Sequence, residues 1–191
     1  MPVEVPARAI EDYLLCPFRA VMTVQRLQGA VDPIKKGIGE RDTPGQIPGD
    51  ILVYPGRHEL TATIWLEDKP ITVRGKPDLV AAWARTPTSP VVVEITSTPI
   101  MGPRSVRHVA VRAQLYALAA TACTGVAHTP LVVSSSLGSR HNALIPPPPG
   151  PLLRRALEGL LASLDSPSPP AARPGPHCYH CLYRHYCPSG W

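Results

Sequence analysis

Four cysteines at opposite ends of the chain set the strongest constraint on how it can fold. Three of them lie near the C-terminus with the spacing C-x2-C-x5-C, at Cys178, Cys181 and Cys187. The fourth, Cys16, lies in a Leu-Cys-Pro-Phe segment near the other end. Four thiols are the number that a structural zinc ion or an iron–sulfur cluster takes from a protein. The pattern therefore predicts a metal site that joins the two ends of the chain.

The cysteine spacing alone leaves the metal open. Three histidines lie among the tail cysteines, at His177, His180 and His185. A Cys/His zinc site could therefore form within the tail, without Cys16. The remaining cysteine, Cys123, stands in an apolar helical segment, where we expect an ordinary buried thiol.

Length and composition predict a cytoplasmic protein with its own core. A chain of 191 residues can bury a core without disulfides, so clustered cysteines indicate metal binding in a reducing compartment. The chain contains no run of about 18 apolar residues, so no membrane span is expected. The N-terminus lacks the pattern of a signal peptide. The net charge of +5, carried mostly by arginine, permits binding to nucleic acid because arginine contacts phosphate in bidentate fashion.

The order of predicted elements is typical of an α/β fold with a mixed central sheet flanked by helices. Helical spacing of apolar residues predicts helices over 7–28 (broken at Pro17), 105–124 and 152–164. Runs rich in Val, Ile and Thr predict strands over 51–54, 60–66, 71–83, 91–96 and 130–135. We expect Ser105 and Gly125 to cap the long helix. Residues 29–50 are expected to form a loop with a short helix, and the prolines at 146–149 a stiff connector. The core is predicted over 1–165, and a proline-rich linker with the cysteine tail over 166–191.

Two acidic residues stand in otherwise apolar strand segments. Asp78 precedes Leu-Val-Ala-Ala, and Glu94 follows Val-Val-Val. A carboxylate buried in such a strand is costly unless a positive charge meets it. If the two strands are adjacent, both carboxylates lie at one end of the sheet and can bind Mg²⁺ or Mn²⁺. Such an ion activates water and stabilises charge on a phosphate. The alternative is that both acids face solvent or pair with arginines.

The same acids carry a resemblance to known nucleases. Pro77-Asp78, fifteen residues and then Glu94-Ile95-Thr96 resemble the PD-(D/E)xK signature, with threonine at the position of its lysine. The segment that contains Gln114 and Tyr116 resembles the glutamine–tyrosine motif of RecB-like nucleases, in which the two residues usually stand four apart.

Two upstream segments extend the resemblance. Gly37-Ile38-Gly39-Glu40 lies where that family often has Gly-x-x-His, and the segment before Cys16 resembles the family's opening helix. With the cysteines, the chain resembles the Cas-four family of CRISPR-associated, RecB-like exonucleases that carry an iron–sulfur cluster. The resemblance covers residues 9–188.

The resemblance implies a restriction-endonuclease-like core, with its tail pinned to the N-terminal helix by an iron–sulfur cluster. The cluster would be [4Fe-4S], which the resemblance favours, or [2Fe-2S], held by the four cysteines. Mg²⁺ or Mn²⁺ would be bound by Asp78, Glu94, Glu40 and the carbonyl of Ile95. Gln114 and Tyr116 would position single-stranded DNA ends. The implied role is processing of DNA during CRISPR spacer acquisition, with CRISPR integrase proteins as partners and an oligomer as one arrangement.

The lysine of the signature is missing. Thr96 is neutral, and no lysine follows Lys76 in the sequence. Lys76 precedes Asp78 by two residues, so on a strand it would point to the same face; Arg107 and Arg112 are further substitutes. Two hypotheses follow: a nuclease of weak activity, or a DNA-end-binding or scaffold protein with the same fold. A protein that interacts through a zinc-ribbon tail is a third.

Overall fold

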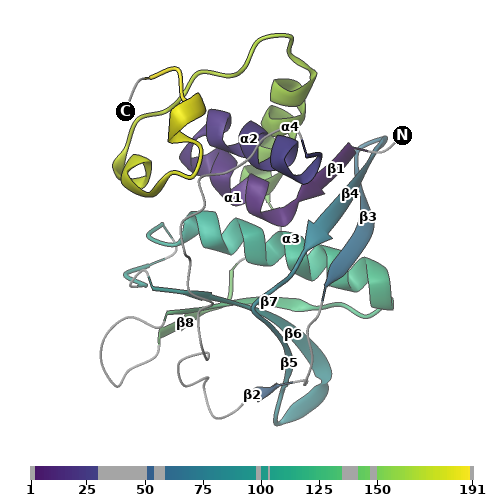
Figure 1. Ribbon diagram of the computed structural model, residues 1–191. Coiled ribbons are helices and arrows are strands. Elements are labelled where there is room, and N and C mark those ends of the chain that lie inside the picture. The colour runs from purple at the N-terminus through teal and green to yellow at the C-terminus, as the bar shows by residue number, and fades with distance from the viewer. Residues whose placement is uncertain are drawn as a thin grey trace.

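Two mixed β-sheets flanked by helices form the part of the chain that the structure describes (Figure 1). The structure is a computed structural model and describes residues 3–29, 51–53, 59–97, 100–102, 104–134, 142–146 and 150–189. Its helices are α1 (Ala7–Leu15), α2 (Pro17–Leu27), α3 (Arg107–Thr124) and α4 (Pro151–Asp165). The predicted α/β class is confirmed.

The strands lie in two sheets, not in the single central sheet that we expected. The smaller sheet has the order β1 (Val3–Pro6), β4 (Lys69–Gly75), β3 (Leu60–Leu66). The larger has the order β2 (Ile51–Val53), β5 (Leu79–Trp83), β6 (Thr86–Thr96), β7 (Thr129–Ser134), β8 (Asn142–Leu144). Parallel pairs (β1 with β4, β6 with β7) and antiparallel pairs occur in both sheets.

The predicted strand over residues 71–83 is wrong, because it is divided between the two sheets. β4 ends at Gly75, the chain crosses over at Lys76-Pro77-Asp78, and β5 begins at Leu79. Pro77 has no N–H to give to a strand ladder, so it stops the first strand. The crossing segment places Asp78 at one end of the larger sheet, just before β5.

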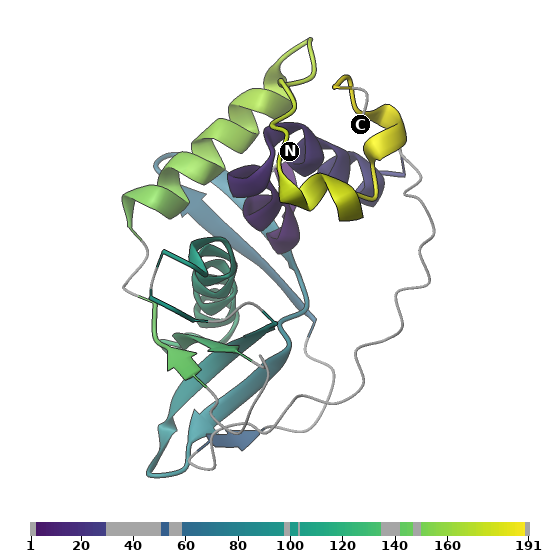
Figure 2. The ribbon, with the colours of Figure 1, turned by 90° about the vertical axis from the view of Figure 1, so that its left-hand side faces the viewer.

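Helix α3 forms the middle layer of the molecule. It lies between the five-stranded sheet on one side and α1, α2 and α4 on the other (Figures 1 and 2). A helix covered on both sides must be apolar around most of its circumference, and ten of its eighteen residues are buried. It ends as predicted at Gly125, whose φ of 72° is left-handed. Ser105 is not its N-cap; that position is Val106, and the Ser105 hydroxyl donates to the Gly102 carbonyl.

The N-terminal helical segment breaks at Cys16, as the sequence predicts. Cys16 has extended backbone angles, and Pro17 begins α2 at a position where its missing N–H costs nothing. The break turns the chain and buries the Cys16 side chain in the main core.

The cysteine tail folds back onto α1 and α2 (Figure 2). It contains two short 3-10 helices, η1 (Pro176–His180) and η2 (Arg184–Tyr186). Tyr183 between them is buried in the same core as Cys16. The linker before the tail also contacts α1, because Arg173 Nη1 donates to the Leu14 carbonyl oxygen at 3.2 Å. The two ends of the chain therefore meet. Among the helices described, none is long and apolar enough to cross a membrane.

Candidate active site and candidate metal centre

Asp78 and Glu94 meet at one end of the five-stranded sheet. β5 and β6 are antiparallel with Leu79 opposite Val93, so the residue before Leu79 comes beside the residue after Val93. The Ile95 N–H donates to Asp78 Oδ2 at 2.7 Å and fixes that carboxylate at the strand end. Asp78 itself is exposed and precedes β5, so the expectation that it lies inside a strand is wrong.

Glu94 is the buried member of the pair, with 1% of its surface exposed. Side chains alternate along β6, and Ile95 packs on the opposite face of the sheet from Val92. Glu94 therefore points toward α3, where Arg112 Nε donates to its Oε2 at 2.6 Å. Its other oxygen, Oε1, is buried and has no hydrogen-bond partner among the described residues. A buried carboxylate oxygen without a partner is a natural ligand for a cation.

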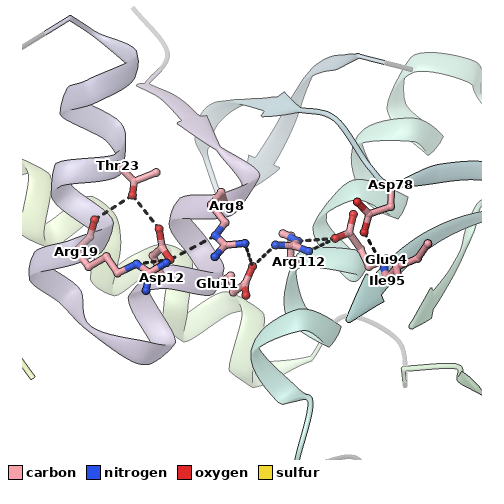
Figure 3. A network of polar contacts seen from close by, with 9 residues as sticks. All are labelled: Arg8, Glu11, Asp12, Arg19, Thr23, Asp78, Glu94, Ile95 and Arg112. Carbon is pink, nitrogen blue, oxygen red and sulfur yellow. Dashed lines mark hydrogen bonds and ion pairs between the residues drawn. The ribbon is translucent and has the colours of Figure 1, made fainter. Parts of the chain in front are cut away.

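Arg112 also binds a second buried carboxylate. Its Nη2 forms an ion pair with Glu94, and its Nη1 pairs with Oε2 of Glu11 on α1. Arg8 Nη1 lies 3.2 Å from the same Glu11 oxygen but is half exposed. Figure 3 shows the three acids Asp78, Glu94 and Glu11 in line, with the guanidinium of Arg112 between the last two.

The network continues along α1 through Arg8 to Asp12, and from there to Arg19 on α2 (Figure 3). Asp12 is buried, and its Oδ1 lies 2.8 Å from Arg19 Nε while Thr23 Oγ1 donates to its Oδ2 at 2.8 Å. Burial raises the pKa of Asp12, against the opposing charges of Arg19 and Arg8. Neighbouring residues on α1 thus face two sites: Glu11 faces the carboxylates, and Asp12 faces the arginine beside the cysteines.

Burial controls the ionisation of Glu94. It raises the pKa of that carboxyl to about 7, and the nearby Asp78 charge adds to the rise while Arg112 opposes it. Burial also disfavours the charged form of Arg112, but Glu94 and Glu11 outweigh it and raise the pKa of the guanidinium. Arg112 is therefore a permanent cation, whereas Glu94 can give up a proton near neutral pH when a metal ion arrives.

We expect this raised pKa to make the metal-free protein less stable as pH rises from 4.5 to about 7. In that window the native Glu94 keeps a proton that the unfolded chain has already lost, so stability falls with pH. Glu94→Gln cannot titrate and should show a shallower fall. Asp12 acts with the same sign in both proteins. Urea unfolding with chelator at several pH values measures the difference; equal slopes would contradict it.

Tyr116 lies on the same face of α3 as Arg112, one turn later. A Cβ built on Gly75 would lie 2.6 Å from the Tyr116 hydroxyl oxygen, so the end of β4 needs glycine. The hydroxyl hydrogen-bonds with the backbone of Lys76, and burial raises the pKa of Tyr116, which keeps it neutral. Tyr116 therefore supports the crossing segment that presents Asp78.

The other predicted site residues are placed as follows. Gln114 is buried but lies about 200° around the helix from Tyr116, so the two do not share a face. Lys76 is exposed in the crossing segment and not on a strand, which removes the argument that it shares a face with Asp78. Thr96 is buried and lies two residues after Glu94 on β6, on the same face of the sheet. Glu40 lies outside the described residues.

Glu11 is absent from the site that the sequence predicts, and Arg112 appears there only as a substitute for lysine. One signal was present: Arg112, not Gln114, stands four residues before Tyr116, the spacing that puts two residues on one helical face. Arg107, the other substitute, is exposed.

The four predicted cysteines line one small cavity between α2 and the tail. Cys16, Cys178, Cys181 and Cys187 share it with Arg19 and His177. The Arg173 N–H donates to Cys16 Sγ at 3.3 Å. Burial raises the pKa of the Cys181 thiol, and the neighbouring Cys16 and Cys178 act in the same direction. The structure thus brings together residues separated by about 160 positions in the sequence.

The spacing of these thiols bears on what they can hold. No three His, Cys, Asp or Glu side chains among the described residues are grouped to bind a single metal ion. A [4Fe-4S] cluster gives each thiolate its own iron atom and a [2Fe-2S] cluster shares four thiolates between two irons, so the cysteines of either surround a larger volume than the ligands of one ion do. Four thiols around one cavity fit that donor set. His177 lines the cavity too, and its buried Nε2 has no partner among the described residues.

Cys123 is not the buried thiol that we expected. It lies near the end of α3, is exposed, and its Sγ is 3.5 Å from the Thr61 carbonyl oxygen. It takes no part in the cysteine cavity.

Comparison with known proteins shows a shared fold and nothing further. No family model matches the chain, and no curated protein matches it. Among solved structures, the crystal structure of SSO0001 is similar, with a TM-score of 0.55 and 15% sequence identity. The match covers 100% of this chain and 88% of that one. At this identity the likeness supports the α/β arrangement alone.

Proposed function

We propose that this protein is a metal-dependent nuclease that acts on single-stranded DNA ends, with Mg²⁺ or Mn²⁺ between Asp78 and Glu94. One observation carries the proposal: the buried, unpartnered Oε1 of Glu94 at the strand end where Asp78 is fixed. Burial raises the pKa of Glu94, and repulsion from the adjacent Asp78 carboxylate adds a smaller increase. A divalent cation relieves that repulsion and satisfies the orphaned oxygen.

The bound ion would supply the Lewis acidity for phosphodiester hydrolysis, as metal ions do in other nucleases. The chain's own residues prepare the position. The Ile95 N–H orients Asp78, and Arg112 orients Glu94. Asp78 is exposed, so a DNA end can reach this side of the pair. Further oxygen ligands would come from the Ile95 carbonyl and from Glu40, which the resemblance to Cas-four nucleases assigns to the metal.

The wider assignment rests on the same resemblance. We propose a restriction-endonuclease-like core of the Cas-four type that processes DNA ends for CRISPR spacer acquisition together with integrase proteins. The position of the two carboxylates supports this proposal, because Glu94 on β6 and Asp78 just before the neighbouring β5 lie together with α3 packed behind Glu94. An oligomer and a cytoplasmic location are parts of this proposal.

We also propose that the four cysteines hold an iron–sulfur cluster with a structural role. They line one cavity where the described tail and the first helices share a buried core. A cluster there would close a loop of most of the chain. Anaerobically purified protein should contain iron and sulfide in proportion; zinc at one per chain with no iron would contradict this.

The test of the nuclease is digestion of end-labelled single-stranded DNA by purified protein after chelator treatment. We expect no cleavage without metal and shortening from the ends when Mn²⁺ or Mg²⁺ is added. The missing lysine predicts a slow rate, since Thr96 cannot assist the attacking water. Cleavage that persists in excess chelator would contradict a metal-dependent site.

A second candidate function is binding of DNA ends without cleavage. Arg112 favours it, because this arginine already neutralises Glu94 without any metal ion. A gel-shift experiment with the same end-labelled DNA separates the two functions. A protein that slows the migration of the DNA in Mn²⁺ but never shortens it binds DNA ends without cleaving them.

A further inference from the structure

Arg112 is a buried cation shared by two buried acids from different parts of the fold. Its side chain is 11% exposed, against 2% for Glu94 on β6 and 6% for Glu11 on α1. Charges at this depth must be compensated by an opposite charge. Arg8 also reaches Glu11 but is about half exposed, and among the described residues Arg112 is the cation that pairs with Glu94.

Glu94 uses its two oxygens differently. Oε2 accepts from Arg112, whereas Oε1 is buried without a partner and lies on the side of Asp78. One carboxylate thus borders two cation positions, one filled by the guanidinium and one open. A carboxylate that lies between two cations, with further acids on either side, is the plan of a two-metal hydrolytic site. Here Asp78 flanks one position and Glu11 the other.

We propose that Arg112 takes the place of a second metal ion, so that this carboxylate site holds one divalent cation where two could otherwise bind. The proposal rests on the proposed function, in that the open position beside Asp78 is taken as the metal position. Arginine suits this role because it stays protonated and forks between two carboxylates. Thr96 is neutral where the signature has lysine, and Arg112 provides a fixed positive charge near the site in its place.

The experiment measures how many Mn²⁺ ions each protein binds at saturation, by calorimetry and by electron paramagnetic resonance. Arg112→Met keeps the length of the side chain without its charge, and Arg112→Lys keeps the charge. The double variant Arg112→Met/Glu11→Gln removes the acid that flanks the second position. Arg154→Met is the matched control, since Arg154 also pairs with two glutamates but is exposed. Circular dichroism verifies that each variant is folded.

We expect one Mn²⁺ in the wild type, in Arg112→Lys and in Arg154→Met. Arg112→Met should bind two ions with the spectrum of a spin-coupled pair, and the double variant should return to one. A folded Arg112→Met that still binds one ion would overturn the proposal. A spin-coupled pair of Mn²⁺ ions in the wild type would overturn it too, and this measurement does not depend on the folding of any variant.

Failure of the proposed function gives a different pattern. If the wild type binds no Mn²⁺ but Arg112→Met binds one, then Arg112 does occupy a cation position and the metal-dependent nuclease is wrong. If the wild type binds one ion without cutting DNA, the nuclease is wrong and the stoichiometry of the variants still decides the role of Arg112. If neither protein binds Mn²⁺, both proposals fail.

Discussion

Glu94→Gln is expected to reduce metal-dependent digestion of single-stranded DNA by about 10³-fold, which corresponds to about 4 kcal/mol of lost transition-state stabilisation. Glutamine has nearly the same shape, so it can still accept from Arg112 Nε through its amide oxygen. It cannot offer a charged oxygen beside Asp78. Initial rates at saturating Mn²⁺ measure the effect. The metal position should be impaired while the fold is kept.

The control for this substitution is Asp68→Asn. Asp68 is an exposed acid in the turn between β3 and β4, and its replacement makes the same change in net charge away from the site. We expect it to digest DNA at the wild-type rate. Asp78→Asn should behave like Glu94→Gln, because an asparagine oxygen can still accept from the Ile95 N–H but carries no charge. Equal rates for all four proteins would show that cleavage does not use these carboxylates.

Cys16→Ser is expected to abolish the iron content and visible colour of the protein and to lower its free energy of unfolding by about 3–5 kcal/mol. The cluster would tie Cys16 to cysteines some 160 residues later, and releasing so long a loop restores much chain entropy to the unfolded state. The tail packs on the main core through Tyr183. We expect the loss of the cluster to loosen this packing before the rest of the fold unfolds. Thermal unfolding under anaerobic conditions, with iron analysis on the same samples, measures both effects.

Cys123→Ser is the matched control for the cysteine site. Cys123 is exposed and lies outside the cavity, so its replacement should leave the iron content and the stability unchanged. If Cys16→Ser retains iron and Cys178→Ser loses it, the metal is held within the tail alone. That result would favour the local Cys/His site over the cluster that joins the ends.

Local patterns in the sequence predicted much of the fold. The break at Cys16-Pro17 could be predicted because proline has no N–H to give to a helix that continues through it. The cap at Gly125 could be predicted because glycine readily adopts the left-handed φ that it has here. The meeting of Asp78 and Glu94 could be predicted because an antiparallel pair of neighbouring strands brings nearby residues together. In each case the interacting residues lie close in the sequence or the backbone rule acts on a single residue.

Contacts between distant segments could not be predicted in this way. Glu11 and Arg112 are 101 residues apart, and no periodicity links a residue of the first helix to one of the third. β1 pairs in parallel with β4, which lies 68 residues later (Val3 opposite Ile71). The four-residue segment Val3–Pro6 is too short to show a strand signal of its own. The division of residues 71–83 between two sheets depends on which strands pair with each half, although Pro77 marked the place.

The most direct test of the account is the position of a bound ion. Crystals soaked in Mn²⁺ and measured at its absorption edge should show one anomalous peak within about 2.5 Å of Glu94 Oε1 and of an Asp78 carboxylate oxygen. The peak should be absent in Glu94→Gln crystals treated in the same way. A wild-type map with no peak there at saturating Mn²⁺, or a peak only at other residues, would contradict the account.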